Sequence, residues 1–236
     1  MANIIITGAS SGIGFEAVLD LTANKENKVI ALARSADKLR KLHEISTSLN
    51  PEGGKLYPAQ FDIVYDNYPD SLIPFIQSKF ESVDILVNNA GILINKPFLD
   101  TSLEEFAQVL QTNLLGHINM IKHIAPLMKN GGHIVNIGSM GGFQGSSKFA
   151  GLSAYSTSKG ALATLTECLA EEFKEQGIKV NCLALGSSQT EMFEEAFPSL
   201  EAGTLAFEMG RYIADFAQNG HKYYNGKVLP VANTTP

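Results

Sequence analysis

Short runs of β-branched and other apolar residues alternate along this chain with longer amphipathic stretches. This alternation is typical of a parallel β-sheet whose strands are joined by helices on both of its faces. The apolar runs predict seven strands, at Asn3–Thr7, Lys28–Ala33, Lys55–Phe61, Val83–Asn88, His133–Gly138, Lys179–Ala184 and Lys227–Val231. The amphipathic stretches predict helices at Gly12–Asn24, Asp37–Leu49, Tyr68–Phe80, Ser102–Met128, Ser153–Gln176 and Thr204–Gln218.

The predicted elements make a doubly wound α/β fold of the Rossmann type, with one seven-stranded parallel sheet. The chain has 236 residues, of which 44% are hydrophobic and 18% are charged. A chain of this length and composition buries one substantial core. Because no boundary or internal repeat interrupts the alternation, residues 1–236 are predicted to form a single domain.

The charge balance argues against polyanionic partners. The chain carries 18 Lys and Arg residues against 24 Asp and Glu residues, a formal net charge of −6. This balance gives no basic surface for nucleic acid or for an anionic membrane. The segment Met1–Ile6 lacks a basic signal-peptide region, and no apolar stretch approaches the ~20 residues of a membrane span. We therefore expect a cytoplasmic protein with neither nucleic-acid nor membrane partners.

The cysteines and histidines offer no metal site. Cys168 falls in a predicted helix and Cys182 in a predicted strand, and neither has a Cys or His neighbour at metal-ligand spacing. Both are expected to be buried and reduced. His117 and His123 lie in a predicted helix and His133 begins a strand, so all three are expected to be structural.

A glycine-rich turn joins the first predicted strand to the first predicted helix. Gly8 allows a tight turn, Gly12 lets backbone amides approach a pyrophosphate, and Gly14 allows close packing of the helix. The helix N-terminus also favours an anion, and serine hydroxyls add donors. The residues predicted to contact the phosphates are Gly8, Ser10, Ser11, Gly12, Ile13 and Gly14.

Further motifs follow in a fixed order along the chain. They are Asp62-Ile63, Asn88-Asn89-Ala90-Gly91, Asn113, Ser139 and Tyr155-Ser156-Thr157-Ser158-Lys159. Together with the glycine-rich turn, this series resembles the short-chain dehydrogenase/reductase family (SDR), from Asn3 to about Val231. The resemblance implies an NAD(P)-dependent oxidoreductase that interconverts a carbonyl and a secondary alcohol by hydride transfer.

Tyr155 and Lys159 also suggest chemistry by their spacing alone. Residues i and i+4 of a helix lie on one face, so the phenol and the ammonium can meet. A free tyrosine has a pKa near ~10, and a neighbouring cation lowers that value by stabilising the phenolate. Tyr155 is therefore predicted to be a general acid/base whose pKa is lowered by Lys159.

The remaining catalytic roles, those of Ser139 and Asn113 and a second role of Lys159, come from the resemblance. It implies that Ser139 holds the substrate oxygen, that Lys159 also contacts the nicotinamide ribose, and that Asn113 orders a water that relays protons to Lys159. The segment Met140–Leu152, between Ser139 and Tyr155, is longer than the family norm. Its glycines and phenylalanines suit either a flexible lip of the substrate pocket or an ordinary surface loop.

The end of the second strand bears on the choice of cofactor. Ala33 stands where NAD-preferring relatives usually carry an acid, and Arg34 follows it. A neutral residue followed by a guanidinium suits the 2′-phosphate of NADP. Ser11 stands where many NADP-using relatives place a second basic residue. NADP(H) is thus preferred, while NAD(H) stays possible.

The remaining cofactor contacts also come from the resemblance. Asp62 is expected to meet the adenine with Ile63 packing nearby, and the alternative role for Asp62 is to cap the next helix. The backbone of Asn89, Ala90 and Gly91 is expected beside the ribose. Thr190 is expected to hold the nicotinamide carboxamide and Gly186 to contact the cofactor, with Leu185 in place of the usual proline.

Residues 187–204, referred to below as the lid segment, follow the sixth strand. Their amphipathic stretch after Thr190 suits a short lid over the pocket, or else a surface helix that packs Met192 and Phe197 inward. No motif selects the substrate or the physiological direction of reaction. The resemblance implies a homodimer or homotetramer formed through the two long helices.

Two other functions stay open. One is reduction of 3-oxoacyl groups on an acyl carrier protein, whose acidic surface needs a basic docking patch, and the net charge disfavours this. The other is a catalytically silent nucleotide-sensing protein with the same fold, because a fold by itself does not establish activity. Retention of Tyr155 and Lys159 disfavours this second alternative.

Overall fold

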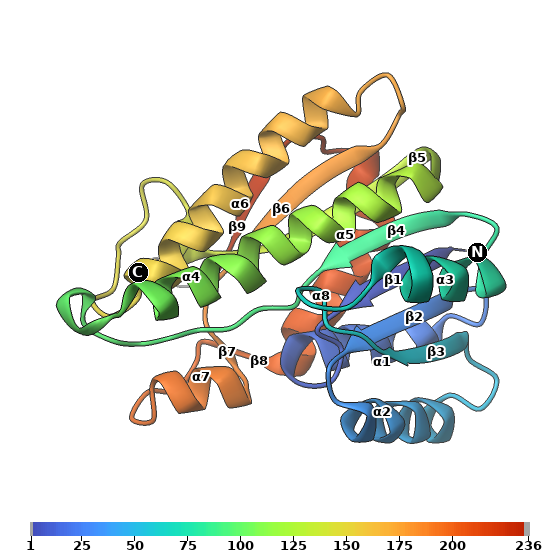
Figure 1. Ribbon diagram of the computed structural model, residues 1–236. Helices are drawn as coiled ribbons and strands as arrows, with labels where there is room; N and C mark the ends of the chain where they lie inside the picture. The colour runs from blue at the N-terminus through green and yellow to red at the C-terminus, as the bar shows by residue number, and fades with distance from the viewer. Residues whose placement is uncertain (1, 234–236) are drawn as a thin grey trace.

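The computed structural model describes residues 2–233 and is built around a seven-stranded sheet (Figure 1). The strand order is β3-β2-β1-β4-β5-β6-β9, and every neighbouring pair is parallel. The strands of this sheet are β1 (Asn3–Thr7), β2 (Lys28–Ala33), β3 (Lys55–Gln60), β4 (Val83–Asn88), β5 (Met128–Ser139), β6 (Lys179–Leu185) and β9 (Val228–Val231). The predicted fold class is confirmed.

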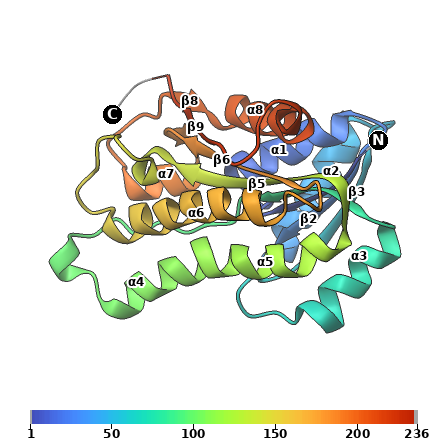
Figure 2. The ribbon, with the colours of Figure 1, turned by 90° about the horizontal axis from the view of Figure 1, so that it is seen from above.

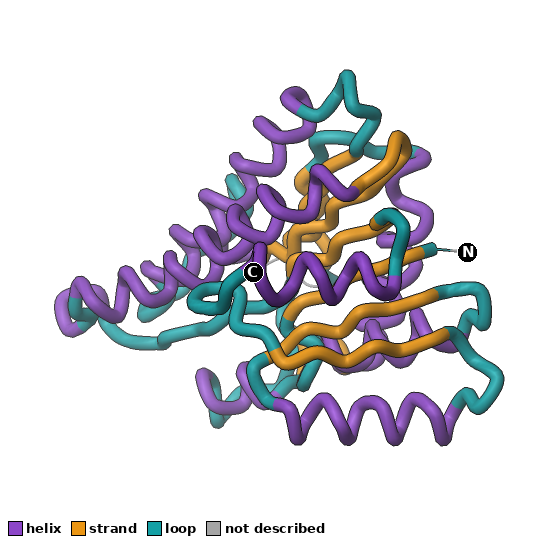
Figure 3. The backbone as a smooth tube through the Cα atoms, turned by 45° about the vertical axis from the view of Figure 1, so that its right-hand side comes forward, coloured by secondary structure: helices purple, strands orange, loops and turns teal. Residues whose placement is uncertain are grey.

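Helices cover both faces of the sheet (Figures 2 and 3). The helices on one face are α1 (Gly12–Ala23), α2 (Ala36–Leu49) and α8 (Ala206–Asn219). The other side carries α3 (Ile73–Lys79), α4 (Leu103–Leu110), α5 (Gly116–Ile124) and α6 (Ser153–Glu172). Within residues 2–233, none of the helices combines the length and apolar character needed to cross a membrane.

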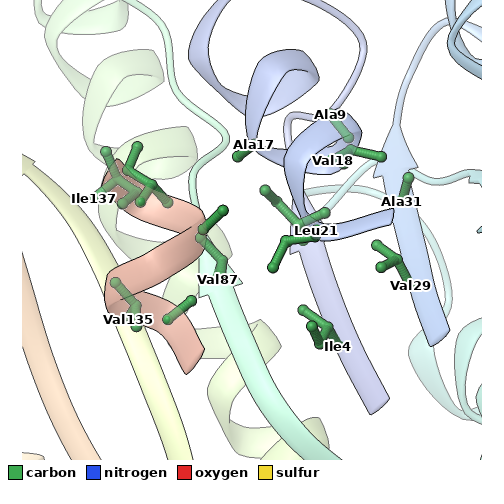
Figure 4. Close-up of a cluster of buried hydrophobic side chains, with 14 of the residues drawn as sticks. Ile4, Ala9, Ala17, Val18, Leu21, Val29, Ala31, Val87, Val135 and Ile137 are labelled. Carbon is green, nitrogen blue, oxygen red and sulfur yellow. The ribbon is translucent and has the colours of Figure 1, made fainter. Parts of the chain in front are cut away.

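The two faces of the sheet explain why its strands are apolar almost throughout. In β1, Ile4 and Ile6 point to the core beneath α1, whereas Ile5 points to the opposite core. Val18 and Leu21 of α1 pack directly on the first of these cores (Figure 4). Strands buried on both faces read as continuous hydrophobic runs, which is why these runs located the strands in the sequence.

The position of β1 determines where a ligand can bind. β1 pairs with β2 on one side and with β4 on the other, so the chain order reverses at this point. In open α/β sheets, the crevice at the carboxyl ends of the strands beside such a reversal is the usual ligand site. The loops after β1 and β4 are therefore the segments on which a site depends.

The predicted helix Ser102–Met128 is wrong in its detail. A π-helical turn at Gln111–Leu115 separates α4 from α5, and a 3-10 turn at Ala125–Leu127 ends this helical segment. Pro126 cannot donate a helical hydrogen bond, and β5 already begins at Met128, which pairs with Val83. The described part of the chain therefore has a longer fifth strand than expected.

Three smaller expectations are corrected. The helix predicted at Tyr68–Phe80 begins with a π-helical turn at Tyr68–Leu72. Residues Thr204–Leu205 (β8) pair with Ser188–Gln189 (β7) and do not begin α8. Cys168 is exposed on α6, because it falls on the outer side of that helix, whereas Cys182 is buried as expected.

Candidate active site

A cavity of about 720 Å³ lies at the carboxyl ends of the strands, beside the reversal at β1. Its volume is that of a typical small-molecule site. Every residue predicted to contact the cofactor lines it, namely Gly8, Ser10, Ser11, Gly12, Ile13, Gly14, Arg34, Asp62, Ile63, Asn89, Ala90, Gly91, Tyr155, Lys159, Gly186 and Thr190. Ser139 lines the same cavity, whereas Asn113 does not.

The glycine-rich turn is packed too tightly for side chains. Gly8 has φ +67° and Gly12 has φ +56°, both in the left-handed region that favours glycine. A Cβ on Gly8 would lie 2.7 Å from the Cα of Ala90, and one on Gly14 would lie under 3.0 Å from the Asn89 side chain. The turn thus leaves its backbone and the α1 N-terminus, which has no acidic residue in its first turn, open to an anion.

Hydrogen bonds fasten the segment after β4 to this turn. The Thr7 hydroxyl accepts from the backbone amides of Asn89 and Ala90, each at 3.0 Å. The Asn89 side chain donates to the carbonyl oxygens of Thr7 and Gly8, at 3.0 and 3.1 Å. The sequence analysis overlooked this role of Thr7, for which a hydroxyl residue at the end of a buried strand was the available signal.

Arg34 and Lys38 form the rim of the cavity beyond β2. Ala33 is buried, and the exposed Arg34 follows it at the cavity wall. Lys38, in the first turn of α2, lines the same wall, and its ammonium lies 2.9 Å from the Glu191 carboxylate of the lid segment. Lys38 was not among the residues predicted to line the site, because its position at the cavity depends on where α2 begins, at Ala36.

Asp62 has a local role within its own loop. Its carboxylate accepts a hydrogen bond of 2.8 Å from the amide of Val64, which stabilises the turn after β3. The next helical turn is capped by Asn67, which accepts from the amide of Asp70. Asp62 therefore lines the cavity without capping that helix.

Tyr155, Lys159 and Ser139 lie together in the wall of the cavity. Tyr155 and Lys159 lie one turn apart on α6, and the Lys159 ammonium is 5.8 Å from the centroid of the Tyr155 ring. The same ammonium donates a 2.7 Å hydrogen bond to the carbonyl oxygen of Ile137. Ser139 ends β5, and its hydroxyl accepts from the amide of Gly141 at 3.1 Å. The end of β5 thus places Ser139 beside the Tyr155–Lys159 pair of α6.

The protonation of these groups follows from burial. Burial raises the pKa of Tyr155, and the Ser139 hydroxyl opposes this by a smaller effect. Burial also lowers the pKa of Lys159 to about 8. The lowering of the Tyr155 pKa expected from Lys159 is therefore not found, because removal of the phenol from water outweighs the other effects on its pKa. At neutral pH, Tyr155 holds its proton and Lys159 is charged.

Asn113 does not line the cavity but stabilises the site through its hydrogen bonds. Its fully buried side chain accepts from the amide of Ile92 at 2.8 Å and donates to the carbonyl of Ile92 at 2.9 Å and to Ser158 at 3.1 Å. Asn113 Oδ1 and Lys159 Nζ both lie within 4 Å of where a Gly91 side chain would stand. Asn113 thus stands beside Lys159 and holds the segment after β4, at the π-helical turn.

The lid segment contains a short helix, α7 (Glu191–Ala196; Figure 1), whose residues Glu191, Met192 and Phe193 line the cavity. The Thr190 hydroxyl caps it by accepting from the amide of Phe193 at 3.2 Å, and Thr190 also lies against Gly12. At the other end, the Asn95 side chain donates a 2.8 Å hydrogen bond to the carbonyl of Ala196. The structure therefore fits the expected lid, with contacts at both ends.

The apolar side chains of α7 face the cavity only in part. Phe193 and Phe197 are half-buried, with ring centroids 5.3 Å apart, and both line the cavity. Met192 lines it as well but keeps 39% of its surface exposed. Of the two side chains that the surface-helix alternative packs inward, Met192 is thus exposed and Phe197 is half-buried beside the cavity.

The long segment Met140–Leu152 also borders the cavity. Met140, Gly141, Phe149 and Leu152 line it, and the Gly151 carbonyl accepts a 2.9 Å hydrogen bond from the amide of Lys96. This arrangement fits the expected lip of a substrate pocket. Gly151 has φ +85°, and a Cβ there would collide with Asn95, so the glycine is required for this approach.

Leu185 takes part in the sheet where relatives usually carry a proline. It pairs with Ser139 of β5 and with Val231 of β9, and the following Gly186 amide donates to the Val231 carbonyl at 2.9 Å. The strand therefore continues up to Gly186, and the loop is anchored by backbone hydrogen bonds.

Of the three histidines expected to be structural, His123 and His133 make hydrogen bonds, whereas neither ring nitrogen of His117 has a hydrogen-bond partner among the described residues. His133 is fully buried, and its ring nitrogens meet the carbonyl of Ala217 at 2.9 Å and the Asn181 side chain at 3.1 Å. His117 is fully buried near Lys159, and burial and this charge lower its pKa to about 3. Among residues 2–233, no group of three or more His, Cys, Asp or Glu side chains is placed to hold a metal ion.

The site as a whole fits a phosphorylated dinucleotide. A glycine-rich turn at a helix N-terminus lies at one place in the cavity, a basic rim at another, and a protonated phenol beside an ammonium at a third. The first two suit phosphate groups, and the third suits proton transfer to a substrate oxygen.

Comparisons with known proteins agree with this geometry. A family model described as short chain dehydrogenase matches residues 2–201, which include every residue lining the cavity. An uncharacterized oxidoreductase of Staphylococcus aureus (strain MRSA252) is 30% identical over 188 residues, covering 79% of this chain and 78% of that protein.

Solved structures give the same result. A short-chain dehydrogenase/reductase from Serratia marcescens has a TM-score of 0.86 at 26% identity, covering 98% of this chain and 96% of that one. A short chain dehydrogenase from Burkholderia cenocepacia, in complex with NADP, has a TM-score of 0.83 at 26% identity, covering 97% of this chain and 95% of that one. The similarity thus extends over nearly the whole fold.

Proposed function

This chain belongs to the short-chain dehydrogenase family, and on that premise we propose that it interconverts a carbonyl group and a secondary alcohol with NADP(H). At the level of the family, the protein is an NAD(P)-dependent oxidoreductase. The observation that carries the finer proposal is the shared cavity, which Tyr155, Ser139 and Lys159 line together with the glycine-rich turn. A proton donor and a phosphate-binding turn in one cavity are what such a reaction needs.

The proposed chemistry divides the reaction between cofactor and protein. Bound nicotinamide supplies or accepts the hydride at the substrate carbon. In the reducing direction, Tyr155 donates its proton to the carbonyl oxygen, which becomes the hydroxyl oxygen of the alcohol. Ser139 donates a hydrogen bond to the same oxygen and orients it. The raised pKa of Tyr155 supports this, because the phenol is protonated at neutral pH.

Lys159 and Asn113 assist Tyr155 in the proposed reaction. We assign to the Lys159 ammonium the stabilisation of the phenolate left after proton transfer, and a contact with the nicotinamide ribose. Asn113, beside Lys159, holds Ile92 and so fixes the segment that passes the ribose. We also propose that Asn113 orders a water molecule that relays protons to Lys159, as the family resemblance implies.

The preference for NADP(H) is supported by the rim beyond β2. No acid stands at Ala33 to repel a 2′-phosphate, and Arg34 offers a guanidinium at the cavity wall. A guanidinium binds phosphate through charge-assisted hydrogen bonds. The Burkholderia cenocepacia relative, which was solved with NADP, is consistent with this preference.

The substrate is proposed to carry an apolar group next to its carbonyl. The side chains that support this line the cavity from three segments and are Leu93, Met140, Phe149, Leu152, Met192, Phe193, Phe197 and Leu200. An apolar wall with few polar groups selects by shape and hydrophobic contact.

Nucleotide titration followed by a carbonyl panel tests the proposal. The protein is titrated with NADPH and NADH by nicotinamide fluorescence, and oxidation of NADPH is then followed with each carbonyl compound. We expect Tyr155→Phe to lose about 100-fold or more in turnover while its NADPH dissociation constant changes less than twofold. Tyr223→Phe removes a hydroxyl from a side chain that is 79% exposed, and it is the matched control.

The outcomes separate the alternative functions. Failure to bind either nucleotide, or full turnover in Tyr155→Phe, refutes the proposal. Binding without turnover of any compound favours a nucleotide-sensing protein. Turnover confined to 3-oxoacyl groups carried on an acyl carrier protein favours the acyl-reductase function.

A further inference from the structure

Lys38 and Glu191 form an ion pair at the cavity rim that folding does not require. Their charged atoms are 2.9 Å apart, and their side chains keep 48% and 66% of their surfaces exposed. Ion pairs exposed to this degree contribute little to stability. Both residues nevertheless line the cavity, whereas Arg40 in the same helix and Glu194 in α7 do not. The pair is therefore placed to act on a ligand.

The pair lies at the end of the cavity that would receive the adenosine. Lys38, in the first turn of α2, follows Arg34 by four positions, and both line the wall that follows β2. Glu191 reaches this wall from the lid segment, directly after Thr190, which lies against Gly12 of the glycine-rich turn. The glycine-rich turn itself has serines and no basic residue. Lys38 is thus the second cation available to a phosphate at this wall.

We propose that Lys38 and Glu191 together determine whether the cofactor's adenosine ribose carries a 2′-phosphate, an inference that rests on the proposed function. A 2′-phosphate takes Lys38 from Glu191, because a phosphate monoester near charge −2 is a stronger partner for an ammonium than one carboxylate. Glu191 then stands beside the phosphate without its cation and opposes it. Lys38 is the attractive determinant for NADP(H), and Glu191 is the repulsive one.

The two residues also couple the cofactor to the lid segment. With a 2′-hydroxyl, the Lys38–Glu191 contact holds the N-terminal end of α7 against α2. With a 2′-phosphate, this contact is lost, and α7 keeps its Thr190 cap and its Asn95 contact but no tie to α2. The two nucleotides thus differ in how the lid segment is held, although their nicotinamides are the same.

Dissociation constants for NADPH and NADH in charge-removal variants test this inference. We expect Lys38→Met to weaken NADPH binding about tenfold and to change NADH binding less than twofold. We expect Glu191→Gln to tighten NADPH binding about threefold, again without an effect on NADH. The matched controls are Arg40→Gln, whose partners are Asp37 and Glu44, and Glu194→Gln, whose partner is Gln189. Neither control should change the ratio of the two constants.

Two results overturn the inference and leave the proposed function intact. They are an equal change of both constants in Lys38→Met, and a Glu191→Gln protein that behaves as Glu194→Gln does, each with Tyr155-dependent turnover still present. Adenosine 2′-monophosphate, measured by calorimetry against the 5′-monophosphate, gives the same comparison without a nicotinamide. A wild-type protein that binds neither dinucleotide refutes the proposed function and this inference with it.

Discussion

Replacing Gly14 with alanine tests how closely the glycine-rich turn packs on the segment after β4. The new Cβ would lie under 3.0 Å from the Asn89 side-chain nitrogen and from the Gly8 carbonyl oxygen. Added volume at a packed site costs about 1–3 kcal/mol. Because one of the two atoms is backbone, a rotamer change alone cannot relieve the clash, so the upper part of this range applies.

Two further effects change this magnitude in opposite directions. Alanine is preferred over glycine in a helix by at most about 1 kcal/mol, which offsets part of the loss. Displacement of Asn89 weakens its hydrogen bonds to Thr7 and Gly8, each worth about 1 kcal/mol. We therefore expect Gly14→Ala to lower the free energy of unfolding by about 2 kcal/mol.

Gly160→Ala is the matched control, because the chemical change is the same but the space is not. A Cβ on Gly160, in α6, would meet its nearest neighbour, the Gly142 carbonyl oxygen, at 3.5 Å, which is an ordinary contact. This variant should gain about 0.5–1 kcal/mol. Urea unfolding followed by circular dichroism at one protein concentration measures both. A Gly14→Ala protein as stable as the wild type would refute the packing argument.

Three other perturbations test the charges and contacts of the site. Burial lowers the Lys159 pKa from 10.5 to about 8, so the unfolded chain binds more protons between these values and the stability from this group rises with pH there. Lys159→Met should therefore be more stable than wild type at pH 7 in urea unfolding, by a margin that shrinks toward pH 10; a constant margin would contradict this. Burial likewise lowers the His117 pKa from 6.5 to about 3, so the unfolded chain binds more protons than the folded chain between these values. Wild type should therefore lose stability relative to His117→Leu as pH falls from 6.5 toward 3, and parallel acid unfolding curves would argue against this. Asn95→Ala removes the hydrogen bond to the Ala196 carbonyl and should raise KM about threefold without changing NADPH affinity, and an unchanged KM would rule out that contact as a support of the lid segment.

The elements that local chemistry determines could be predicted from the sequence. Six of the seven strands, all except β5, differ from their predicted bounds by at most one residue at either end, because a strand buried on both faces must be apolar throughout. Gly8 and Gly12 were located by their place between strand and helix, and both have the left-handed backbone that such a turn needs. The long helix was predicted without its interruption at Gln111–Leu115, because that segment contains no proline or glycine to signal a π-helical turn.

The candidate site divides in the same way. The chain by itself determined which residues follow each strand, and parallel strands bring their carboxyl ends to one edge, so the predicted cofactor residues line one cavity. Only the tertiary structure decided that Lys38 meets Glu191, 153 positions away, and that Asn95 meets Ala196, 101 positions away. It also decided the direction of the Tyr155 pKa, because burial and not spacing sets the cost of a charge. Contacts between loops depend on where the packed sheet and helices place them, and no local pattern of residues encodes that position.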